Sequence, residues 1–455
     1  MLRLEQLISI LGATPSGILR GTVHRISTDS RRVQPGDVFV ALVGERFDGH
    51  DFVAAALAQG AVAAIIHRRD LLTPDQPLLW VPDTLQAYQT LAAWWRQRFA
   101  IPVIAVTGSA GKTTTKELIA AVLSQYGRVL KSAANENNDI GVAKTLLQLR
   151  PDYDYAVVEM GMRGRGQIAR LARMAQPQVG VITTVGTAHI GQLGSREAIA
   201  QAKCELLAHL PPRTGTAVYW RENALLHQTA QAVWDGATYT YGLTQGDLQG
   251  RVEGHELVIG DWRYPLPLPG EHNACNFLAA LAVAQVLGLP WRTLSQPLAV
   301  DLPTGRSTWQ PLAPDILLLD ESYNASPEAV CAALQTLKQQ PGRRYIAVLG
   351  AMRELGEQSA ALHREVGQWV RALGYDCLIL LDDPEVAPLA EAAQPVTTES
   401  YATTDQITAR LLSLLQPGDR VLVKASRSVG LDRVVQALTQ HDQGISQGHR
   451  QGLGG

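Results

Sequence analysis

The sequence predicts a three-domain α/β protein, and three observations lead to that prediction. The chain has 455 residues, more than a single hydrophobic core usually organises. Strand patterns alternate with helix patterns along most of it, and a glycine-rich turn joins one strand to one helix. We expect a small α/β domain at 1–98, a central domain with a mostly parallel sheet at 99–302, and a Rossmann-like doubly wound domain at 303–440.

Each region has its own series of predicted elements. The first region carries strand patterns at 38–42, 63–66 and 78–81 and helix patterns at 52–59 and 85–98. The central region carries strand patterns at 103–107, 155–159 and 179–185 and helix patterns at 113–125, 195–210 and 273–287. Buried parallel strands are predicted in the third region at 316–320, 345–350, 377–381 and 420–424. The tail, 441–455, is rich in glycine and glutamine with almost no apolar residues, so we expect disorder there.

The turn that follows the strand at 103–107 has the chemistry of an anion site. Gly108 and Gly111 permit close backbone approach, and the helix starting at Lys112 directs N–H groups and the positive end of its dipole toward the turn. Lys112 could reach outer phosphates, and the Thr113 hydroxyl suits a Mg²⁺ ligand position. The general phosphate-loop pattern would need glycine at position 106, where this chain has Val106. A purely structural turn is the alternative, and Gly-Lys-Thr in this context favours phosphate binding.

Two residues after later strands are candidates for a metal site. Glu159 stands where a buried strand runs into a glycine turn, so its carboxylate could hold Mg²⁺ over the phosphates. The ordinary alternative is a capping or solvated glutamate. His189 lies in a loop after a β-rich run, but a lone histidine is more often structural and Mg²⁺ prefers oxygen ligands.

Lys203 is an unusual residue in its predicted helix. Apolar residues at helical spacing mark a buried stripe, and Lys203 lies at its edge, four residues after Ile199. A lysine whose head reaches water along such a stripe is the ordinary interpretation. The alternative is a buried amine with a lowered pKa, nucleophilic enough to capture CO₂ as a carbamate that binds Mg²⁺.

Composition excludes several other classes of protein. The 40 basic and 42 acidic residues give a formal charge of −2, so nothing favours nucleic acid or an anionic membrane as a partner. The four cysteines are scattered without metal-site or disulfide spacing, which suits a reducing cytoplasm. Neither a signal-peptide layout nor a membrane-length apolar stretch is visible. We therefore expect a cytoplasmic protein, and a monomer.

The motifs together resemble the Mur ligase family, whose members join an amine to a carboxylate at the expense of ATP. The resemblance rests on the phosphate-loop variant, on Ala202-Lys203-x-Glu205 after Thr187-Ala-His189, and on Gly270-Glu-His-Asn273-Ala-Cys-Asn276, and it covers the chain except its tail. It implies a P-loop-type ATPase domain, two Mg²⁺ ions, and a carbamylated Lys203. The implied metal residues are Thr113, Glu159, His189 and Lys203, and the implied catalytic residues are Lys112, Lys203 and His189. The implied ATP-binding residues are Gly108, Ser109, Ala110, Gly111, Lys112, Thr113, Thr114, Asn276, Arg306 and Asp320.

Further motifs narrow the resemblance to particular members of the family. Residues 27–41 and 44–52 are similar to the UDP-binding domain of the third and fourth ligases of the peptidoglycan pathway. Residues 135–147 and 322–329 are similar to the members that add D-alanyl-D-alanine. The resemblance implies UDP-substrate contacts at Ser30, Arg31, Phe47, His50, Asn137 and Asn138. It implies dipeptide contacts at Tyr323, Asn324, Lys424, Ser426 and Arg427.

The expected reaction joins D-alanyl-D-alanine to UDP-N-acetylmuramoyl-tripeptide through an acyl phosphate, giving the pentapeptide, ADP and phosphate. The sister ligase that adds the third amino acid is the nearer alternative; it typically carries Asp-Asn-Pro-Arg, and this chain has Asp382-Asp383-Pro384-Glu385. A nucleotide-switch ATPase that forms no bond is the more distant one. The chain departs from the family at Ala351, where an aspartate is frequent.

Overall fold

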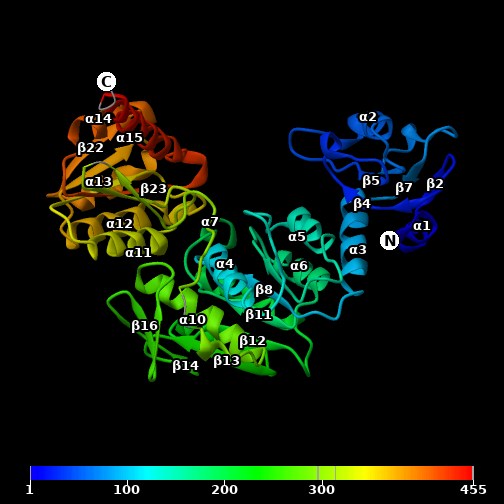
Figure 1. Ribbon diagram of the computed structural model, residues 1–455, viewed down its shortest axis with the longest axis horizontal. Helices are drawn as coiled ribbons and strands as arrows, with labels where there is room; N and C mark the ends of the chain where they lie inside the picture. The colour runs from blue at the N-terminus through cyan, green and yellow to red at the C-terminus, as the bar shows by residue number, and fades with distance from the viewer. Residues whose placement is uncertain (1, 295–296, 313, 453–455) are drawn as a thin grey trace. The chain divides into compact units, whose positions relative to one another are not determined.

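The computed structural model describes residues 2–294, 297–312 and 314–452, and the chain forms two compact units (Figure 1). The first unit comprises Met1–Ala105, Gly127–Met160 and Ala169–Gln178. The second comprises Val106–Tyr126, Gly161–Ile168 and Val179–Gly455. Within the described residues, every helix is too short or too polar to cross a membrane.

The N-terminal part of the first unit is a small α/β fold. Its five-stranded sheet has the order β2-β7-β6-β5-β4, parallel except where β2 pairs with β7. The strands are β2 Thr14–Ser16, β4 Arg25–Ser27, β5 Asp37–Val40, β6 Ala63–Ile66 and β7 Leu78–Trp80. A two-stranded sheet joins β1 Leu2–Arg3 to β3 Thr22–Val23, and the helices are α1 Leu4–Leu11, α2 Val53–Ala58 and α3 Thr84–Arg96. β5 and β6 are buried along their whole length, which explains their continuous apolar runs.

A seven-stranded sheet follows, in the order β14-β13-β12-β11-β8-β10-β9. Its strands are β8 Val103–Thr107, β9 Val129–Lys131, β10 Tyr155–Glu159, β11 Val179–Ile182, β12 Thr216–Trp220, β13 Ala237–Gly242 and β14 Leu248–Gln249. The associated helices are α4 Lys112–Leu123, α5 Asp139–Leu146, α6 Gln167–Ala175, α8 Arg196–Cys204, α9 Ala224–Val233 and α10 Glu271–Val286. β11, β12, β13 and β14 pair in parallel, as the alternating pattern predicts.

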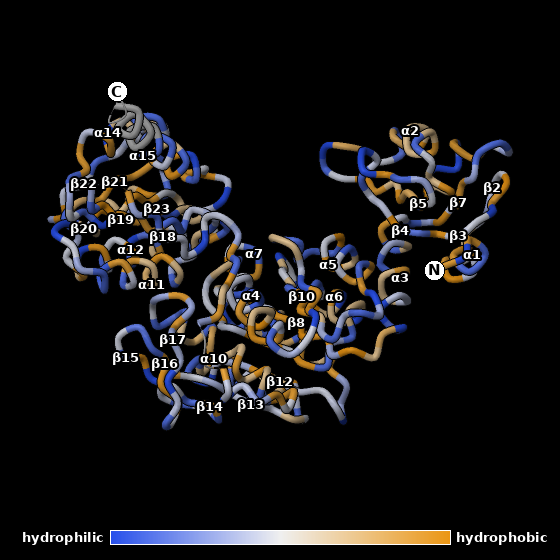
Figure 2. The backbone as a smooth tube through the Cα atoms, viewed as in Figure 1, coloured by the Kyte–Doolittle hydropathy of each residue, from blue (hydrophilic) through white to orange (hydrophobic). Residues whose placement is uncertain are grey.

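Helix α10 supports the start of α4 from within the second unit. Its residues from Phe277 to Ala284 are all buried, and Figure 2 shows this stretch in apolar colours. A helix that is apolar on every side belongs inside a domain, and α10 packs directly against α4. The small antiparallel sheet of β15 Arg251–Glu253, β16 Glu256–Ile259 and β17 Trp262–Pro265 precedes it.

The last part of the second unit is a doubly wound sheet. Its order is β18-β19-β23-β20-β21-β22, with only β18 antiparallel among the described strands. The strands are β18 Thr308–Leu312, β19 Ile316–Asp320, β20 Arg344–Leu349, β21 Cys377–Leu381, β22 Thr397–Tyr401 and β23 Asp419–Lys424. The helices are α11 Pro327–Lys338, α12 Ser359–Ala372, α13 Ala387–Ala393, α14 Thr404–Leu414 and α15 Asp432–Gly452, and Figure 1 shows α11 and α12 on one side of the sheet and α14 and α15 on the other.

Three sequence predictions differ from the structure. α15 continues to Gly452, so the predicted disorder of the tail is wrong for 441–452, and 453–455 lie outside the described residues. Adding residues to an existing helix gains one backbone hydrogen bond for each, so a polar sequence can prolong it. The helix predicted at 195–210 ends at Cys204, and the strand predicted at 179–185 ends at Ile182.

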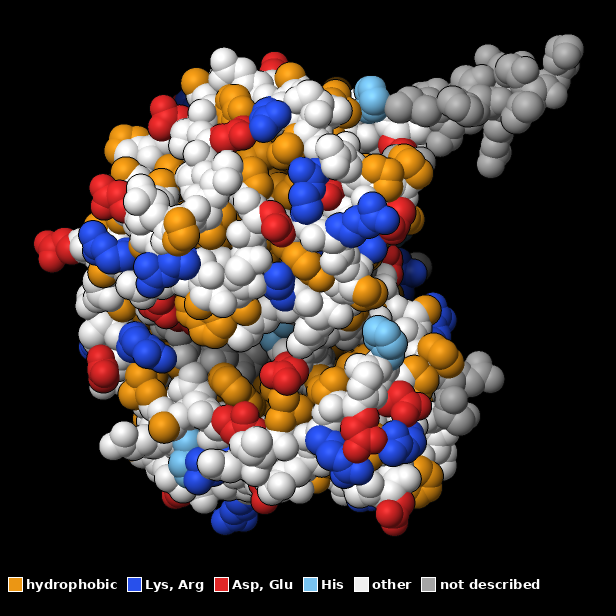
Figure 3. Space-filling view, turned by 90° about the vertical axis from the view of Figure 1, so that its left-hand side faces the viewer, with side chains coloured by type: hydrophobic (Ala, Val, Ile, Leu, Met, Phe, Trp, Pro, Cys, Tyr) orange, Lys and Arg blue, Asp and Glu red, His pale blue; other side chains and the backbone are white. Residues whose placement is uncertain are grey.

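Figure 3 shows basic and acidic side chains interspersed on the face that it draws, with no broad field of one sign there. This distribution agrees with the nearly equal numbers of basic and acidic residues in the sequence.

Candidate active site

The turn between β8 and α4 has the form that its sequence predicts. Gly108 and Gly111 adopt φ of 154° and 77°, in the region that favours glycine, and α4 begins at Lys112. Lys112 Nζ donates to the Gly108 carbonyl at 2.8 Å, so the ammonium folds back over the turn. Thr113 and Thr114 are buried at the helix start. Together these groups form a compact turn at a helix N-terminus, the geometry that suits phosphate oxygens.

A second segment, after β11, supports this phosphate loop. Ser109 N donates to the Thr184 carbonyl at 2.9 Å, and Gly186 N donates to Ser109 Oγ at 2.9 Å. The Thr183 hydroxyl donates to the Ala110 carbonyl. The position of the turn therefore depends on residues more than 70 positions away in the chain.

Asn276 lies beneath the phosphate loop. Its Oδ1 accepts from Thr115 Oγ1 at 3.0 Å, and a Cβ added at Gly111 would lie 2.6 Å from the same oxygen. Its Nδ2 donates to Asn273 Oδ1 at 3.2 Å. The family resemblance implies that Asn276 binds ATP, and in the structure its side chain lies at the turn between β8 and α4.

Gly108 has little room for a side chain, and we expect Gly108→Ala to impair nucleotide binding. An added Cβ would lie 1.8 Å from Thr183 Oγ1, in a conformation that is strained for alanine. Strain of this kind costs about 1–3 kcal/mol, so ADP affinity measured by calorimetry should fall by about tenfold or more. Gly164→Ala is the control, because its Cβ would meet only the end of Gln167 at 3.8 Å. Equal ADP affinity in both variants would contradict the close packing of this loop.

Lys203 is buried rather than extended toward water. It is 2 % exposed on the inner side of α8, which excludes the interpretation of a lysine with a solvated head. Burial lowers its pKa well below the usual value, and the charge of Lys112 lowers it further. Among the residues that the structure describes, no carboxylate forms an ion pair with it. Lys203 is therefore a buried amine with a lowered pKa, within electrostatic reach of Lys112.

His189 adopts a left-handed backbone conformation, with φ of 68°, at the start of the short helix α7 Ile190–Leu193. Its Nδ1 contacts the carboxylate of Glu354. Burial lowers the pKa of His189 to about 4, with help from the charge of Lys112 and against the effect of Glu354. The imidazole is consequently neutral at physiological pH, the form in which histidine binds metals.

Comparisons with known proteins agree with this geometry. Residues 106–284 match the Mur ligase middle domain, 305–427 the Mur ligase glutamate ligase domain, and 22–96 the Mur ligase family catalytic domain. A Synechocystis protein named UDP-N-acetylmuramoyl-tripeptide–D-alanyl-D-alanine ligase is 54% identical over 418 residues, covering 91% of this chain and 92% of that protein.

The chain belongs to the Mur ligase family. The Escherichia coli protein of the same name is 38% identical over 460 residues, covering 96% of this Mur ligase and 98% of that protein. The solved structure of MurF from Acinetobacter baumannii has a TM-score of 0.86 at 32% identity and covers 96% and 99% of the two chains. That of MurF ligase from Thermotoga maritima in complex with ADP has a TM-score of 0.81 at 28% identity and covers 92% and 98%. The chain is thus an ATP-dependent ligase with the α/β fold of its family.

The residues of this Mur ligase are compatible with Mg²⁺. No three His, Cys, Asp or Glu side chains gather as a metal-binding group within the described residues. Mg²⁺ needs no such cage, because it is usually held by one or two carboxylates together with phosphate oxygens and water. Glu159 is buried at the end of β10, where Asn137 Nδ2 donates to its Oε1 at 2.8 Å. The residues that the family resemblance implies for the metal are Thr113, Glu159, His189 and Lys203 as a carbamate, and this assignment stays a prediction.

The implied UDP-binding residues fall into two groups in the structure. Phe47 is 72 % exposed, and Arg31 is exposed and held by Asp29 through two contacts of 2.9 Å, beside Ser30 at the start of a short 3₁₀ helix. These side chains are accessible to a ligand. Asn138 instead caps α5 by accepting from Gly141 N.

The implied contact of His50 with UDP does not fit the structure. Its side chain is fully buried, with Nδ1 at 2.6 Å from Asp48 Oδ1 and Nε2 accepting from His67 N at 3.1 Å. Because both ring nitrogens are engaged within the chain, His50 stabilises its loop and is not available to a ligand.

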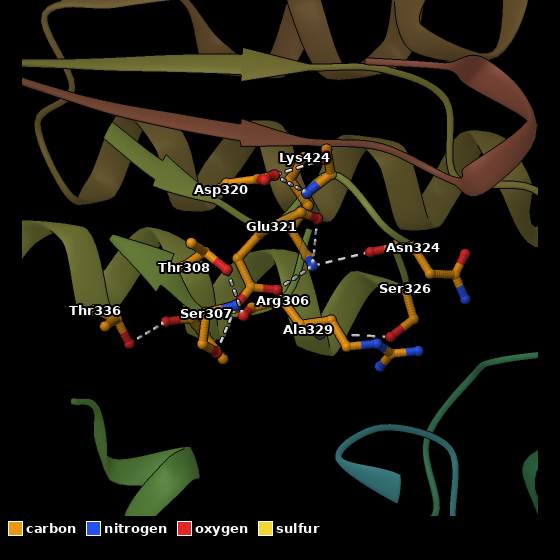
Figure 4. Close-up of polar contacts among 12 residues, drawn as sticks. Arg306, Ser307, Thr308, Asp320, Glu321, Asn324, Ser326, Ala329, Thr336 and Lys424 are labelled. Atoms are coloured by element: carbon orange, nitrogen blue, oxygen red, sulfur yellow. Dashed lines mark hydrogen bonds and ion pairs between the residues drawn. The ribbon is translucent and has the colours of Figure 1, made fainter. Parts of the chain in front are cut away.

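Residues of the third region surround Tyr323. The guanidinium of Arg306 lies 4.1 Å from the centre of the Tyr323 ring and that of Arg427 lies 5.4 Å from it. Lys424 donates to Glu321 Oε2 at 3.1 Å and to the Asn324 carbonyl at 2.9 Å, as Figure 4 shows. The structure therefore brings together residues that the sequence assigned to ATP and to the dipeptide.

Asp320, which the resemblance assigns to ATP, and Ser426, which it assigns to the dipeptide, both form hydrogen bonds within the chain. Asp320 is buried and accepts from the Ser322 backbone and hydroxyl, and burial raises its pKa. Ser426 accepts from Arg353 N at 2.8 Å. Ala351 is completely buried, so an aspartate there would need its own partners.

Sequence reasoning missed three carboxylates of this Mur ligase. Glu321 accepts from the Ser307 backbone and hydroxyl and from Lys424 (Figure 4). Glu328 and Glu354 reach the segment that supports the phosphate loop. No local pattern marks them, since each acts on residues far away in sequence.

Proposed function

We propose that the chain is the ligase that joins D-alanyl-D-alanine to UDP-N-acetylmuramoyl-tripeptide in peptidoglycan synthesis. The observation that carries this proposal is the match to two relatives of that name over more than nine-tenths of their length, at 54% and 38% identity. The phosphate loop and the buried Lys203 supply the groups that the reaction needs. We also propose a cytoplasmic monomer, as the sequence predicts.

The proposed reaction begins with transfer of the γ-phosphoryl group of ATP to the tripeptide carboxylate. Lys112 and the N–H groups of the phosphate loop offset the charge of the phosphates and of the attacking carboxylate. The free amine of the dipeptide then attacks the acyl phosphate, and phosphate leaves. Closure of the domains would exclude water from the acyl phosphate.

Carbamylation of Lys203 is part of the proposal. A neutral amine reacts with CO₂ to form a carbamate and release one proton, and the lowered pKa of Lys203 favours the neutral amine. Carbamylation replaces a cation with an anion, which removes repulsion toward a metal ion. Bound Mg²⁺ would supply charge stabilisation to the transferring phosphoryl group.

The three regions are proposed to divide the substrates among them. Residues 1–98 would hold the UDP-sugar, 99–302 ATP, and 303–440 the dipeptide. The exposed Phe47 and Arg31 support the first assignment, and the residues around Tyr323 support the third. Asn137 joins the substrate and metal sides through its hydrogen bond to Glu159.

An assay of phosphate release tests the proposed function. The enzyme receives ATP with UDP-tripeptide or UDP-dipeptide, and then either D-alanyl-D-alanine or single amino acids. Release that depends on both the UDP-tripeptide and the dipeptide is the expected result. Release with UDP-dipeptide and one amino acid would indicate the sister ligase, and release independent of UDP-linked peptides would indicate a nucleotide switch.

Phe47→Ala should weaken binding of the UDP-linked substrate and leave the chemical step nearly intact. Stacking of a base on an aromatic ring contributes about 1–3 kcal/mol, so the KM for UDP-tripeptide should rise by about tenfold while kcat changes little. Steady-state kinetics measure both quantities. Ile18→Ala is the control, because Ile18 is another exposed apolar side chain of the same region, 78 % exposed. An unchanged KM in Phe47→Ala would contradict a uracil contact.

A further inference from the structure

Two carboxylates from the C-terminal region hold the segment Gly186–Gly191 of the second unit. Glu328, in the first turn of α11, accepts from Thr187 N at 2.7 Å. The Glu354 carboxylate contacts His189 Nδ1, and the Glu354 carbonyl accepts from Gly191 N at 3.0 Å. The mechanism proposed above uses neither glutamate.

A close contact between two glycines lies beside these carboxylates. A Cβ on Gly191 would lie 2.6 Å from Gly356 N, and a Cβ on Gly356 would lie 2.7 Å from the Gly191 Cα. Since both obstructing atoms belong to the backbone, neither could move aside as a flexible side chain would. Only glycine at Gly191 lets the two backbones approach this closely without a shift.

The same segment continues to the phosphate loop. Gly186 N donates to Ser109 Oγ, so the segment contacts the phosphate loop at one end and Glu354 at the other. Glu354 is itself oriented by Arg163, whose Nε lies 3.6 Å from Oε1, while Oε2 faces His189. The C-terminal region and the ATP site are therefore joined by a short chain of direct contacts.

We infer that Glu354 is a positioning residue for His189. It orients the His189 imidazole toward the Mg²⁺ position proposed at the ATP site. It does so when the backbones of Gly191 and Gly356 are in contact. A carboxylate that accepts a hydrogen bond from Nδ1–H fixes the tautomer in which Nε2 carries a free lone pair. Docking of the 350–356 loop would thereby prepare His189 for a metal ion. The inference rests on the proposed role of His189 at Mg²⁺.

Binding of Mn²⁺ to the full-length enzyme with ADP, followed by electron paramagnetic resonance, tests the inference without relying on turnover. Loss of a carboxylate that orients a metal-binding histidine commonly lowers metal affinity by about 10–100-fold, and we expect this for Glu354→Ala. Glu354→Gln keeps an oxygen acceptor, so it should lose less of the affinity for Mn²⁺ than Glu354→Ala does. Glu357→Gln is the matched control, because Glu357 is an exposed acid directly after this loop, and the variant should bind Mn²⁺ normally.

A double-mutant cycle shows whether Glu354 acts through His189. His189→Ala should lower the affinity for Mn²⁺ at least as much as Glu354→Ala does. The double variant should bind Mn²⁺ no more weakly than His189→Ala alone. Normal Mn²⁺ affinity in Glu354→Ala, with a loss in His189→Ala, would overturn the inference and leave the metal assignment standing. Normal affinity in His189→Ala would instead overturn the proposed metal role of His189.

Gly191→Ala tests the docking contact separately. Alanine favours a helix more than glycine does, so α7 itself should be no less stable in this variant. The added Cβ should nevertheless disturb the contact with Gly356. Amide hydrogen exchange over 186–191 should become faster, and the affinity for Mn²⁺ should fall. Unchanged exchange and unchanged Mn²⁺ affinity would overturn the role of the glycine contact.

Discussion

Replacing Lys112 with methionine should lower kcat by about a hundredfold or more, because it removes a charge from a site where charge develops. The Lys112 ammonium lies over the phosphate loop, bound to the Gly108 carbonyl. Methionine keeps most of the apolar stem, so packing at the start of α4 should persist. Rapid-quench measurement of phosphoryl transfer, with ATP and UDP-tripeptide saturating, isolates the affected step.

The control for this prediction is the thermal unfolding of the same variant. An unchanged Tm together with the loss of phosphoryl transfer would assign the effect to the charge. Near-normal transfer in folded Lys112→Met would contradict the assignment of the turn between β8 and α4 as the phosphate site.

Replacing Lys203 should also nearly abolish ligation. Metal-ion stabilisation contributes several kcal/mol to phosphoryl transfer, so Lys203→Ala should lose about a hundredfold or more in kcat. Acetate or formate should partly restore its activity by supplying the missing oxygens. Lys203→Arg keeps a positive charge but cannot form the carbamate, so it should stay inactive with or without these anions.

The stability of Lys203→Met to unfolding gives an independent control for the loss of activity at this position. The side chain is buried without a carboxylate partner in the described part of the chain, so Lys203→Met should be at least as stable to unfolding as the parent enzyme. Inactivity of a well-folded Lys203→Met would then reflect lost chemistry. An active Lys203→Arg enzyme would contradict the carbamate.

The sequence predicted the strand, turn and helix around Gly108 correctly because the information for them is local. The apolar run at 103–107 predicts the strand, and Gly108, Gly111 and Lys112, within five residues, predict the turn and the helix start. The doubly wound sheet was predictable for a similar reason, since parallel strands buried on both faces have continuous apolar runs.

The burial of individual side chains, which only the structure shows, could not be predicted from the sequence. Helical spacing placed Lys203 at the edge of an apolar stripe, but only packing shows that its ammonium is enclosed. His50 matched a substrate-binding motif, whereas its ring is enclosed by Asp48 and His67. Glu328 and Glu354 escaped prediction because their partners lie in another region; Glu328 and Thr187 are 141 positions apart.

Mass spectrometry of the product tests the central claim most directly. The enzyme is incubated with ATP, UDP-N-acetylmuramoyl-tripeptide and an equimolar mixture of D-alanyl-D-alanine and single amino acids. We predict that the mass of the UDP-linked peptide increases by that of one dipeptide less one water, with one ADP formed for each product. ATP hydrolysis without any conjugate, or addition of a single amino acid, would contradict the account.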